Sequence, residues 1–214
     1  MPLTHTDVPV PRHYVCILYP GYQLLDWAGP VDILSTGARD ESGMKDTVTF
    51  VADTSASIPM AMRPPEGSNW TFEPFAALSS NGTMRGTNFN VSTAVDLTFE
   101  GLLDQLAAHN GKFKVHSSAT NETEWRTVDC LLIPGGFGAR LTRIDNTTGT
   151  KTSNIASSVS FIRKLVAGDF IRSAILTVCT GSYILGQTGL LDGRRACTNH
   201  LAYQWVADNN RNVE

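Results

Sequence analysis

Apolar residues in this chain form short continuous runs that alternate with stretches of helical spacing. The continuous runs occupy residues 13–19 (HYVCILY), 47–52 (TVTFVA), 128–133 (VDCLLI) and 174–178 (AILTV), with a weaker one at residues 90–97 (NVSTAVDL). Runs of this length, rich in β-branched residues and without a polar face, predict buried strands.

Helical spacing of apolar residues appears between these runs. We expect helices within residues 24–34 (LLDWAGPVDIL), 101–109 (GLLDQLAAH), 155–167 and 181–191. Pro30 lies near the start of the first, Gly168 ends the third, and Asp192-Gly193 closes the fourth. Residues 54–88, rich in Pro, Gly, Ser and Asn, predict loop, and the polar stretch up to residue 126 predicts irregular structure.

This alternation predicts an α/β fold with a mostly parallel sheet covered by helices on both faces. In such sheets, functional groups gather at the carboxyl ends of the strands. Pro20-Gly21, Gly135-Gly136 and Cys179 all fall at such ends. The length of 214 residues suits one domain, which we place at residues 13–214 after an N-terminal tail at residues 1–12.

Composition excludes several classes of function. The net charge is −3 and there is no basic stripe, so we expect no binding to nucleic acid. No apolar run reaches the ~20 residues that a membrane helix needs. The N-terminus lacks the features of a signal peptide, so we expect a cytoplasmic protein with four reduced cysteines. The cysteine spacing fits no zinc site, and we expect no metal.

Cys179 stands where the strand of residues 174–178 turns into a helix (AILTVCTGSYIL). A sharp strand-to-helix turn lifts a side chain out of the sheet, and Gly181 permits the close approach that this turn needs. A helix N-terminus also favours an anion, so we expect the pKa of this thiol to be lowered. The alternative is a buried cysteine at a strand end.

Two further groups of residues complete the expected site. Gly135 and Gly136, together with the amide of Thr180, are candidate donors to developing negative charge; a plain tight turn is the alternative for Gly135 and Gly136. Gly181 is a further candidate for binding the oxyanion or the substrate. Asp26, an acid within an apolar stretch, is the candidate proton carrier, with its pKa raised by burial and by a neighbouring thiolate. A capping or solvated aspartate is its alternative.

His200, in ACTNHLAYQW, is either a base or substrate-binding group, or a residue that starts the last helix and hydrogen-bonds locally. Thr180 follows the candidate nucleophile directly, so its hydroxyl can reach the same site.

Together, LYPGYQLLDWAGPVDIL, DCLLIPGGFG and ILTVCTGSYILGQTGLLDGRRACTNHLAYQW resemble the ThiJ/PfpI family of the class I glutamine amidotransferase-like superfamily. Within it, the chain looks most like the isonitrile hydratase branch and its fungal relatives. Residues 54–127 match poorly. The resemblance implies a flavodoxin-like three-layer sandwich, a homodimer, a small-molecule substrate and no cofactor. Against the family pattern, we expect the usual C-terminal strand and helix to be lacking.

The resemblance also implies a reaction, in which an isocyanide and water give an N-substituted formamide. The catalytic set of the isonitrile hydratases corresponds to Asp26, Cys179 and Thr180. The Asp and the Thr argue against the protease and deglycase activities of the family. The alternatives are a non-catalytic ligand-binding or redox-responsive thiol protein of the same fold, or glyoxalase III-like chemistry. The fold also serves as a sensor domain in AraC-type regulators, but no helix-turn-helix is predicted within the 214 residues, so we do not expect a DNA-binding regulator.

Overall fold

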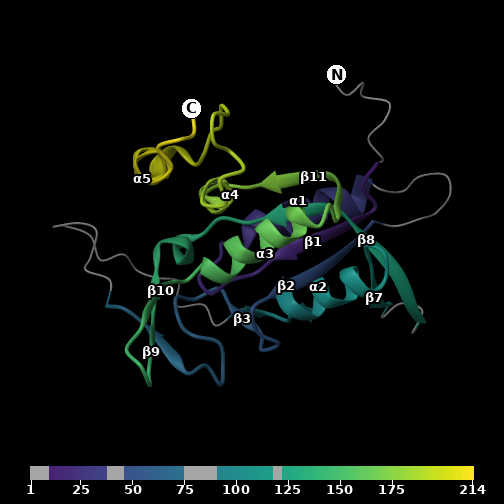
Figure 1. Ribbon diagram of the computed structural model, residues 1–214, viewed down its shortest axis with the longest axis horizontal. Helices are drawn as coiled ribbons and strands as arrows, with labels where there is room; N and C mark the ends of the chain where they lie inside the picture. Colours follow the sequence, from purple (N-terminus) through teal and green to yellow (C-terminus); the bar gives the residue numbers. More distant parts are fainter. Residues whose placement is uncertain (1–9, 38–45, 75–90, 118–121) are drawn as a thin grey trace.

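A mostly parallel sheet forms the centre of the protein (Figure 1). The computed structural model describes residues 10–37, 46–74, 91–117 and 122–214. The parallel strands lie in the order β11-β8-β1-β2-β6, and β7 pairs antiparallel with β8. Their bounds are β1 His13–Ile17, β2 Thr47–Ala52, β6 Leu97–Thr98, β7 Lys112–Ser117, β8 Glu122–Ile133 and β11 Ile171–Thr177.

Helices cover the two faces of this sheet. Cys16 of β1 and Phe50 of β2 are register partners and so share a face. Trp27 of α1 packs edge-on against Phe50, with ring centroids 4.7 Å apart. Helices α2 and α3 lie across the sheet from α1 (Figure 1). The helices are α1 Leu25–Gly37, α2 Phe99–Ala108, α3 Ala156–Ala167, α4 Gly181–Gly186 and α5 Tyr203–Asn209. This is the flavodoxin-like three-layer sandwich that was predicted.

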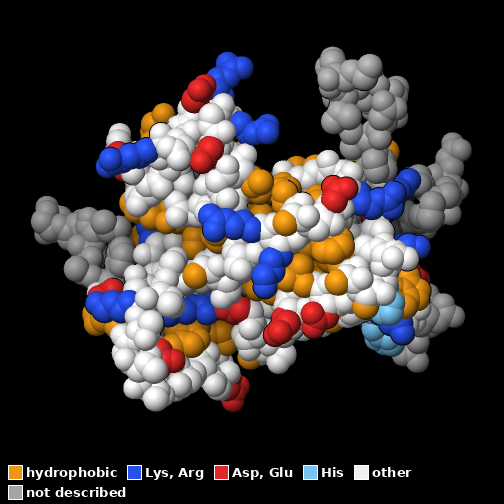
Figure 2. Space-filling view, in the orientation of Figure 1, with side chains coloured by type: hydrophobic (Ala, Val, Ile, Leu, Met, Phe, Trp, Pro, Cys, Tyr) orange, Lys and Arg blue, Asp and Glu red, His pale blue; other side chains and the backbone are white. Residues whose placement is uncertain are grey.

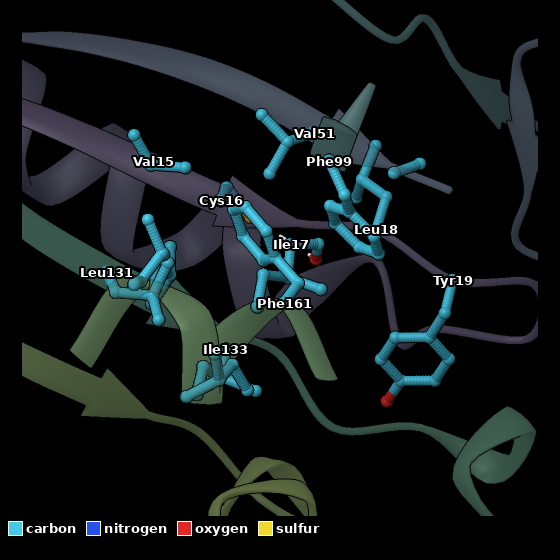
Figure 3. Packing of buried hydrophobic residues seen from close by; sticks show 14 of the residues in the cluster. Val15, Cys16, Ile17, Leu18, Tyr19, Val51, Phe99, Leu131, Ile133 and Phe161 are labelled. Carbon is cyan, nitrogen blue, oxygen red and sulfur yellow. Dashed lines mark hydrogen bonds between the residues drawn. The ribbon is translucent and has the colours of Figure 1, made fainter. Parts of the chain in front are cut away.

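The core lies between the sheet and the helices α2 and α3. Figure 3 shows Val15 and Ile17 of β1 in one cluster with Leu131 of β8 and Phe161 of α3. Phe99 of α2 stacks on Phe161 with ring centroids 4.3 Å apart. The apolar runs on β1 and β8 therefore became buried strands, as their composition predicted, whereas β11 at the edge of the sheet is only partly buried.

Most strong apolar patterns gave the predicted elements. The runs at residues 13–19, 47–52, 128–133 and 174–178 fall on β1, β2, β8 and β11. The pattern at residues 155–167 gives α3, which ends at Gly168. The expected tail at residues 1–12 lies mostly outside the described residues, which begin at residue 10.

Three sequence predictions were wrong. Residues 90–97 do not form one strand: they contain β5 Ser92–Thr93 and the start of β6. The described part of residues 54–88 contains β3 Ile58–Pro59, which pairs with β5, and β4 Trp70–Phe72, which pairs with β9 Thr142–Asp145. The expected irregular stretch forms β7 and the first half of β8. Its signal was the alternation of KFKVHS, in which Phe113 is buried and the lysines beside it are exposed.

The fourth predicted helix is also shorter than expected. Helix α4 ends at Gly186, and the chain continues in turns through Gly189, whose φ of 83° cannot continue a right-handed helix. Among the described residues, no strand pairs with the outer side of β11, and Leu176 on that strand is 41% exposed. The remaining elements are β10 Lys151–Ser153 and the 3-10 turns η1 Phe137–Arg140 and η2 His200–Ala202.

The surface carries charges of both signs. On the described part of the face in Figure 2, basic and acidic side chains are interspersed with apolar patches. No helix in the described ranges combines the length and apolar character that crossing a bilayer requires.

Candidate active site

The carboxyl ends of β1, β8 and β11 bring three loops together, as the sequence predicted. The Gly138 amide donates to the Gly21 carbonyl at 2.9 Å, and the Gln23 amide donates to the Gly135 carbonyl at 2.8 Å. A Cβ on Gly138 would lie 1.9 Å from the Pro20 carbonyl oxygen, so only glycine allows this approach. The loops after β1 and β8 are therefore docked backbone against backbone.

Cys179 occupies a strained elbow between β11 and α4. Its φ of 55° is left-handed, and among the described non-glycine residues only Asn110 and Asp169 share a positive φ. A left-handed backbone is easier for Asn and Asp than for Cys, and strain at a single side chain is typical of functional sites. The Cys179 carbonyl accepts hydrogen bonds from the hydroxyls of Ser182, at 3.2 Å, and Thr198, at 3.3 Å.

Gly181 makes the elbow possible but does not line the site. A Cβ at Gly181 would lie 2.1 Å from the Ile133 carbonyl oxygen of β8. Its amide donates to the Val178 carbonyl at 2.8 Å, so it is not free to bind a substrate. The expected role in close packing therefore fits, whereas the expected role in substrate binding does not.

Asp26, near the start of α1, lies against the thiol. Its side chain is buried, with 8% of its surface exposed, and its Oδ2 accepts the Gly135 amide at 3.0 Å. An interaction with the Cys179 side chain also acts on this carboxylate and lowers its pKa. Burial raises the pKa of Asp26, although the Gly135 hydrogen bond and the Cys179 interaction oppose the rise. The predicted direction is confirmed, and burial is its cause.

The pKa of Cys179 is raised, so the predicted lowering was wrong. Burial is the largest cause and the negative charge of Asp26 is the second; hydrogen bonds from the amide and hydroxyl of Thr180 favour the thiolate but do not outweigh them. The following helix, α4, has only six residues and begins at Gly181. Cys179 is therefore a protonated thiol at rest, and it shares the cleft with a carboxylate that can accept its proton.

The two glycine amides proposed as donors to developing charge already donate hydrogen bonds to side chains of the protein. The Gly135 amide holds Asp26, and the Gly136 amide donates to the Thr180 hydroxyl oxygen at 3.0 Å. Gly135 must be glycine, because a Cβ would lie 2.5 Å from the Thr180 nitrogen and 2.9 Å from Asp26 Oδ2. These amides thus position the catalytic candidates instead of facing a substrate.

Asp26, Gly136, Cys179 and Thr180 open into one cleft with a volume of about 760 Å³. This is within the usual range for small-molecule sites. Its other walls come from the loops after β1 and β8 and from the chain around η2. The lining residues there are Gln23, Phe137, Arg140, Asn199, Leu201 and Ala202.

His200 does not belong to this cleft. It is exposed on η2, while its neighbours Asn199 and Leu201 line the wall. A short 3-10 turn sends consecutive side chains in different directions, which a linear pattern does not reveal. The interpretation of His200 as the start of the last helical segment fits the structure, and the role in substrate binding does not.

Arg140 is a charged residue of the cleft that the sequence analysis did not predict. It ends the run PGGFGAR, directly after the glycine loop, and its charge was the available signal. Its guanidinium carbon lies 4.8 Å from the centre of the Phe137 ring and 4.4 Å from that of Trp205. Burial lowers the pKa of Arg140. In the part of the chain that is described, no three His, Cys, Asp or Glu side chains are grouped to hold a metal ion.

Comparisons with known proteins identify the fold. No protein-family model matches the chain, and no curated protein matches it. The chain is similar in structure to a proposed transcriptional regulator protein from Vibrio parahaemolyticus, with a TM-score of 0.52 and 11% identity over 95% of this chain and 75% of that one. A ThiJ/PfpI domain protein from Brachyspira murdochii gives a TM-score of 0.50 and 9% identity over 96% and 80%.

A third similar structure is a ThiJ/PfpI family protein from Pseudomonas syringae, with a TM-score of 0.48 and 18% identity over 95% of this chain. The chain spans 57% of that protein's length. At these identities the similarities concern the fold alone, and that fold is the one of ThiJ/PfpI domain proteins.

Proposed function

We propose that this protein is a cofactor-free, cysteine-dependent hydratase of the ThiJ/PfpI family that converts isocyanides into N-substituted formamides. One observation carries the proposal: the Cys179 thiol, at a strained elbow, shares one cleft with the buried Asp26 carboxylate, which acts on its pKa and whose Oδ2 is held by the Gly135 amide. A homodimer and a cytoplasmic location belong to the same proposal.

In the first step, the Cys179 sulfur attacks the terminal carbon of R–N≡C. The S–H proton passes to Asp26 as the S–C bond forms, and Asp26 then delivers it to the same carbon. The product is a thioimidate, R–N=CH–S–Cys. Burial raises the pKa of Asp26, so this carboxylate is a stronger proton acceptor than an ordinary aspartate, which suits general acid–base catalysis.

In the second step, water attacks the thioimidate carbon. Asp26 takes a proton from the water while the C=N electron pair moves to nitrogen. Asp26 then gives this proton to the nitrogen, and the product is R–NH–CH(OH)–S–Cys. The C–S bond then breaks, R–NH–CHO leaves, and the hydroxyl proton returns through Asp26 to the sulfur. Thr180 orients the sulfur through its amide and hydroxyl.

The raised pKa of Cys179 also bears on the alternatives. Redox-sensing cysteines have lowered pKa values and are rich in thiolate, whereas this thiol is protonated at rest. Glyoxalase III-like chemistry would use the same pair on methylglyoxal. If the chain is a ligand-binding protein, its ligand would bind in the same cleft without being converted.

An isocyanide hydration assay tests the proposal, with formamide followed by proton NMR. Cys179→Ala is expected to reduce turnover by on the order of 10³-fold or more, because it removes the nucleophile. Cys197→Ala is the matched control: it removes an exposed thiol and should leave the rate unchanged. Equal turnover by the Cys179 variant would overturn the proposal, and so would turnover of methylglyoxal but of no isocyanide.

A further inference from the structure

Arg140 is held in the wall of the catalytic cleft by aromatic rings. Its guanidinium lies near Phe137, within the same turn η1, and near Trp205 of α5. The Trp205 ring packs in turn on Tyr183 of α4, with centroids 4.3 Å apart. Stacked guanidinium groups keep their N–H edges available for ligands, since the rings contact only the π face.

This cation has no carboxylate partner among the described residues. Arg143, by contrast, pairs with Asp53. Partial burial of an arginine without an anion costs free energy, so the arrangement favours an anionic ligand. Arg140 and Cys179 line the same cleft, and a bound anion there would lie near the thiol.

We propose that Arg140 binds a carboxylate group of the substrate, so that this site acts on small organic acids and not on neutral compounds. The nature of the reacting group rests on the proposed function; the recognition of the acid does not. A planar carboxylate matches the guanidinium edge through two parallel hydrogen bonds. A single positive charge in a cleft that Asp26 also lines suits a monoanion better than a phosphate dianion, which the Asp26 carboxylate would repel.

Turnover provides the first test, with isocyanoacetate and its neutral ethyl ester as paired probes. The wild type should have the larger kcat/KM for isocyanoacetate. In Arg140→Gln, the ratio of kcat/KM for the anion over the ester should fall about 10- to 100-fold, the usual effect of losing a charged hydrogen bond. Arg172→Gln, an exposed arginine on β11, is the matched control and should keep the wild-type ratio. An unchanged ratio in Arg140→Gln would overturn the proposal.

Alkylation provides a second test that does not need hydratase activity. Iodoacetate and iodoacetamide both react by displacement of iodide by sulfur, and they differ mainly in charge. The ratio of their rates at Cys179 should fall about 10-fold in Arg140→Gln and recover in part in Arg140→Lys, as expected for loss of a neighbouring positive charge. The ratio at the exposed Cys197, measured in the same peptide digest, should not change.

The outcomes separate the two proposals. A changed alkylation ratio without hydration of either isocyanide would refute the hydratase and support the acid-binding site. An unchanged ratio would refute the acid-binding site even if isocyanides are hydrated. If Cys179 reacts with neither reagent, calorimetry with N-formylglycine decides: weaker binding by Arg140→Gln than by Arg172→Gln supports the proposal, and equal binding overturns it.

Discussion

Replacing Asp26 with asparagine tests whether this carboxylate is the base that accepts the thiol proton. Asparagine has nearly the same shape, and its side-chain oxygen can still accept the Gly135 amide, now 3.0 Å from Asp26 Oδ2. Its amide cannot take the proton of Cys179. The change thus removes the proposed chemistry while the loop after β8 keeps its anchor.

The expected effects on turnover and on thiol acidity have opposite signs. General acid–base catalysis contributes about 10²- to 10⁴-fold, which corresponds to roughly 3–5 kcal/mol, so kcat should fall by that factor. The negative charge of Asp26 is the second cause of the raised Cys179 pKa, so its removal should lower that pKa. The variant should therefore form thiolate more easily and yet turn over far more slowly.

The assay pairs kcat with a titration of thiolate absorbance near 240 nm. A Cys197→Ser background removes the exposed thiol. The two remaining thiols do not interfere, because burial raises the pKa of Cys130 to about 11 and that of Cys16 further. A variant with wild-type kcat would refute the role of Asp26 as the base. An unchanged or higher thiol pKa would refute the electrostatic coupling.

Thermal stability checks that the variant is folded. Burial raises the pKa of Asp26 in the folded state, so its contribution to stability is full below its unfolded pKa and is lost as the pH rises through the folded value. At neutral pH the carboxylate thus opposes folding, and Asp26→Asn should melt no lower than the wild type. A large drop in Tm would mean that lost turnover reflects unfolding.

Two further predictions concern packing and pH. Gly135→Ala should reduce turnover by at least about 10-fold, because a Cβ 2.5 Å from the Thr180 nitrogen forces the catalytic residues apart; wild-type kcat would contradict this. Burial lowers the pKa of His13 from 6.5 to about 4, so stability is full above pH 6.5 and falls by about 3 kcal/mol as the pH drops toward 4. Urea unfolding at several pH values measures the free energy of unfolding, and its dependence on pH should be weaker in His13→Gln. The same dependence on pH in that variant and in the wild type would refute this prediction.

Local pattern was sufficient wherever burial followed directly from composition. Continuous apolar runs became β1, β2, β8 and β11, because a segment without a polar face is most stable within a sheet that helices cover. Burial is complete only where neighbours lie on both sides, and β11 at the edge stays partly exposed. The glycines after β8 and the thiol after β11 were predicted to meet, and they do, since the ends of adjacent parallel strands lie at one edge of the sheet.

Weak or polar patterns were decided by partners outside the pattern itself. Residues 112–117 pair with the start of β8, although their composition reads as irregular. The backbone amides of Gly135 and Gly136 turned toward Asp26 and Thr180, because the loops after β1 and β8 approach closely enough to exclude side chains. Nothing in the glycine pair alone indicates where an amide will find its acceptor.

The amino-acid order alone established the layers of the fold and the elbow that presents Cys179, since periodicity and glycine turns act over a few residues. Folding in three dimensions decided the sign of the thiol pKa, the use of the glycine amides, the exclusion of His200 and the entry of Arg140 into the cleft wall. These properties depend on how far water is excluded from a group and on its distance from residues that are remote in the sequence. Both are set only when the chain folds.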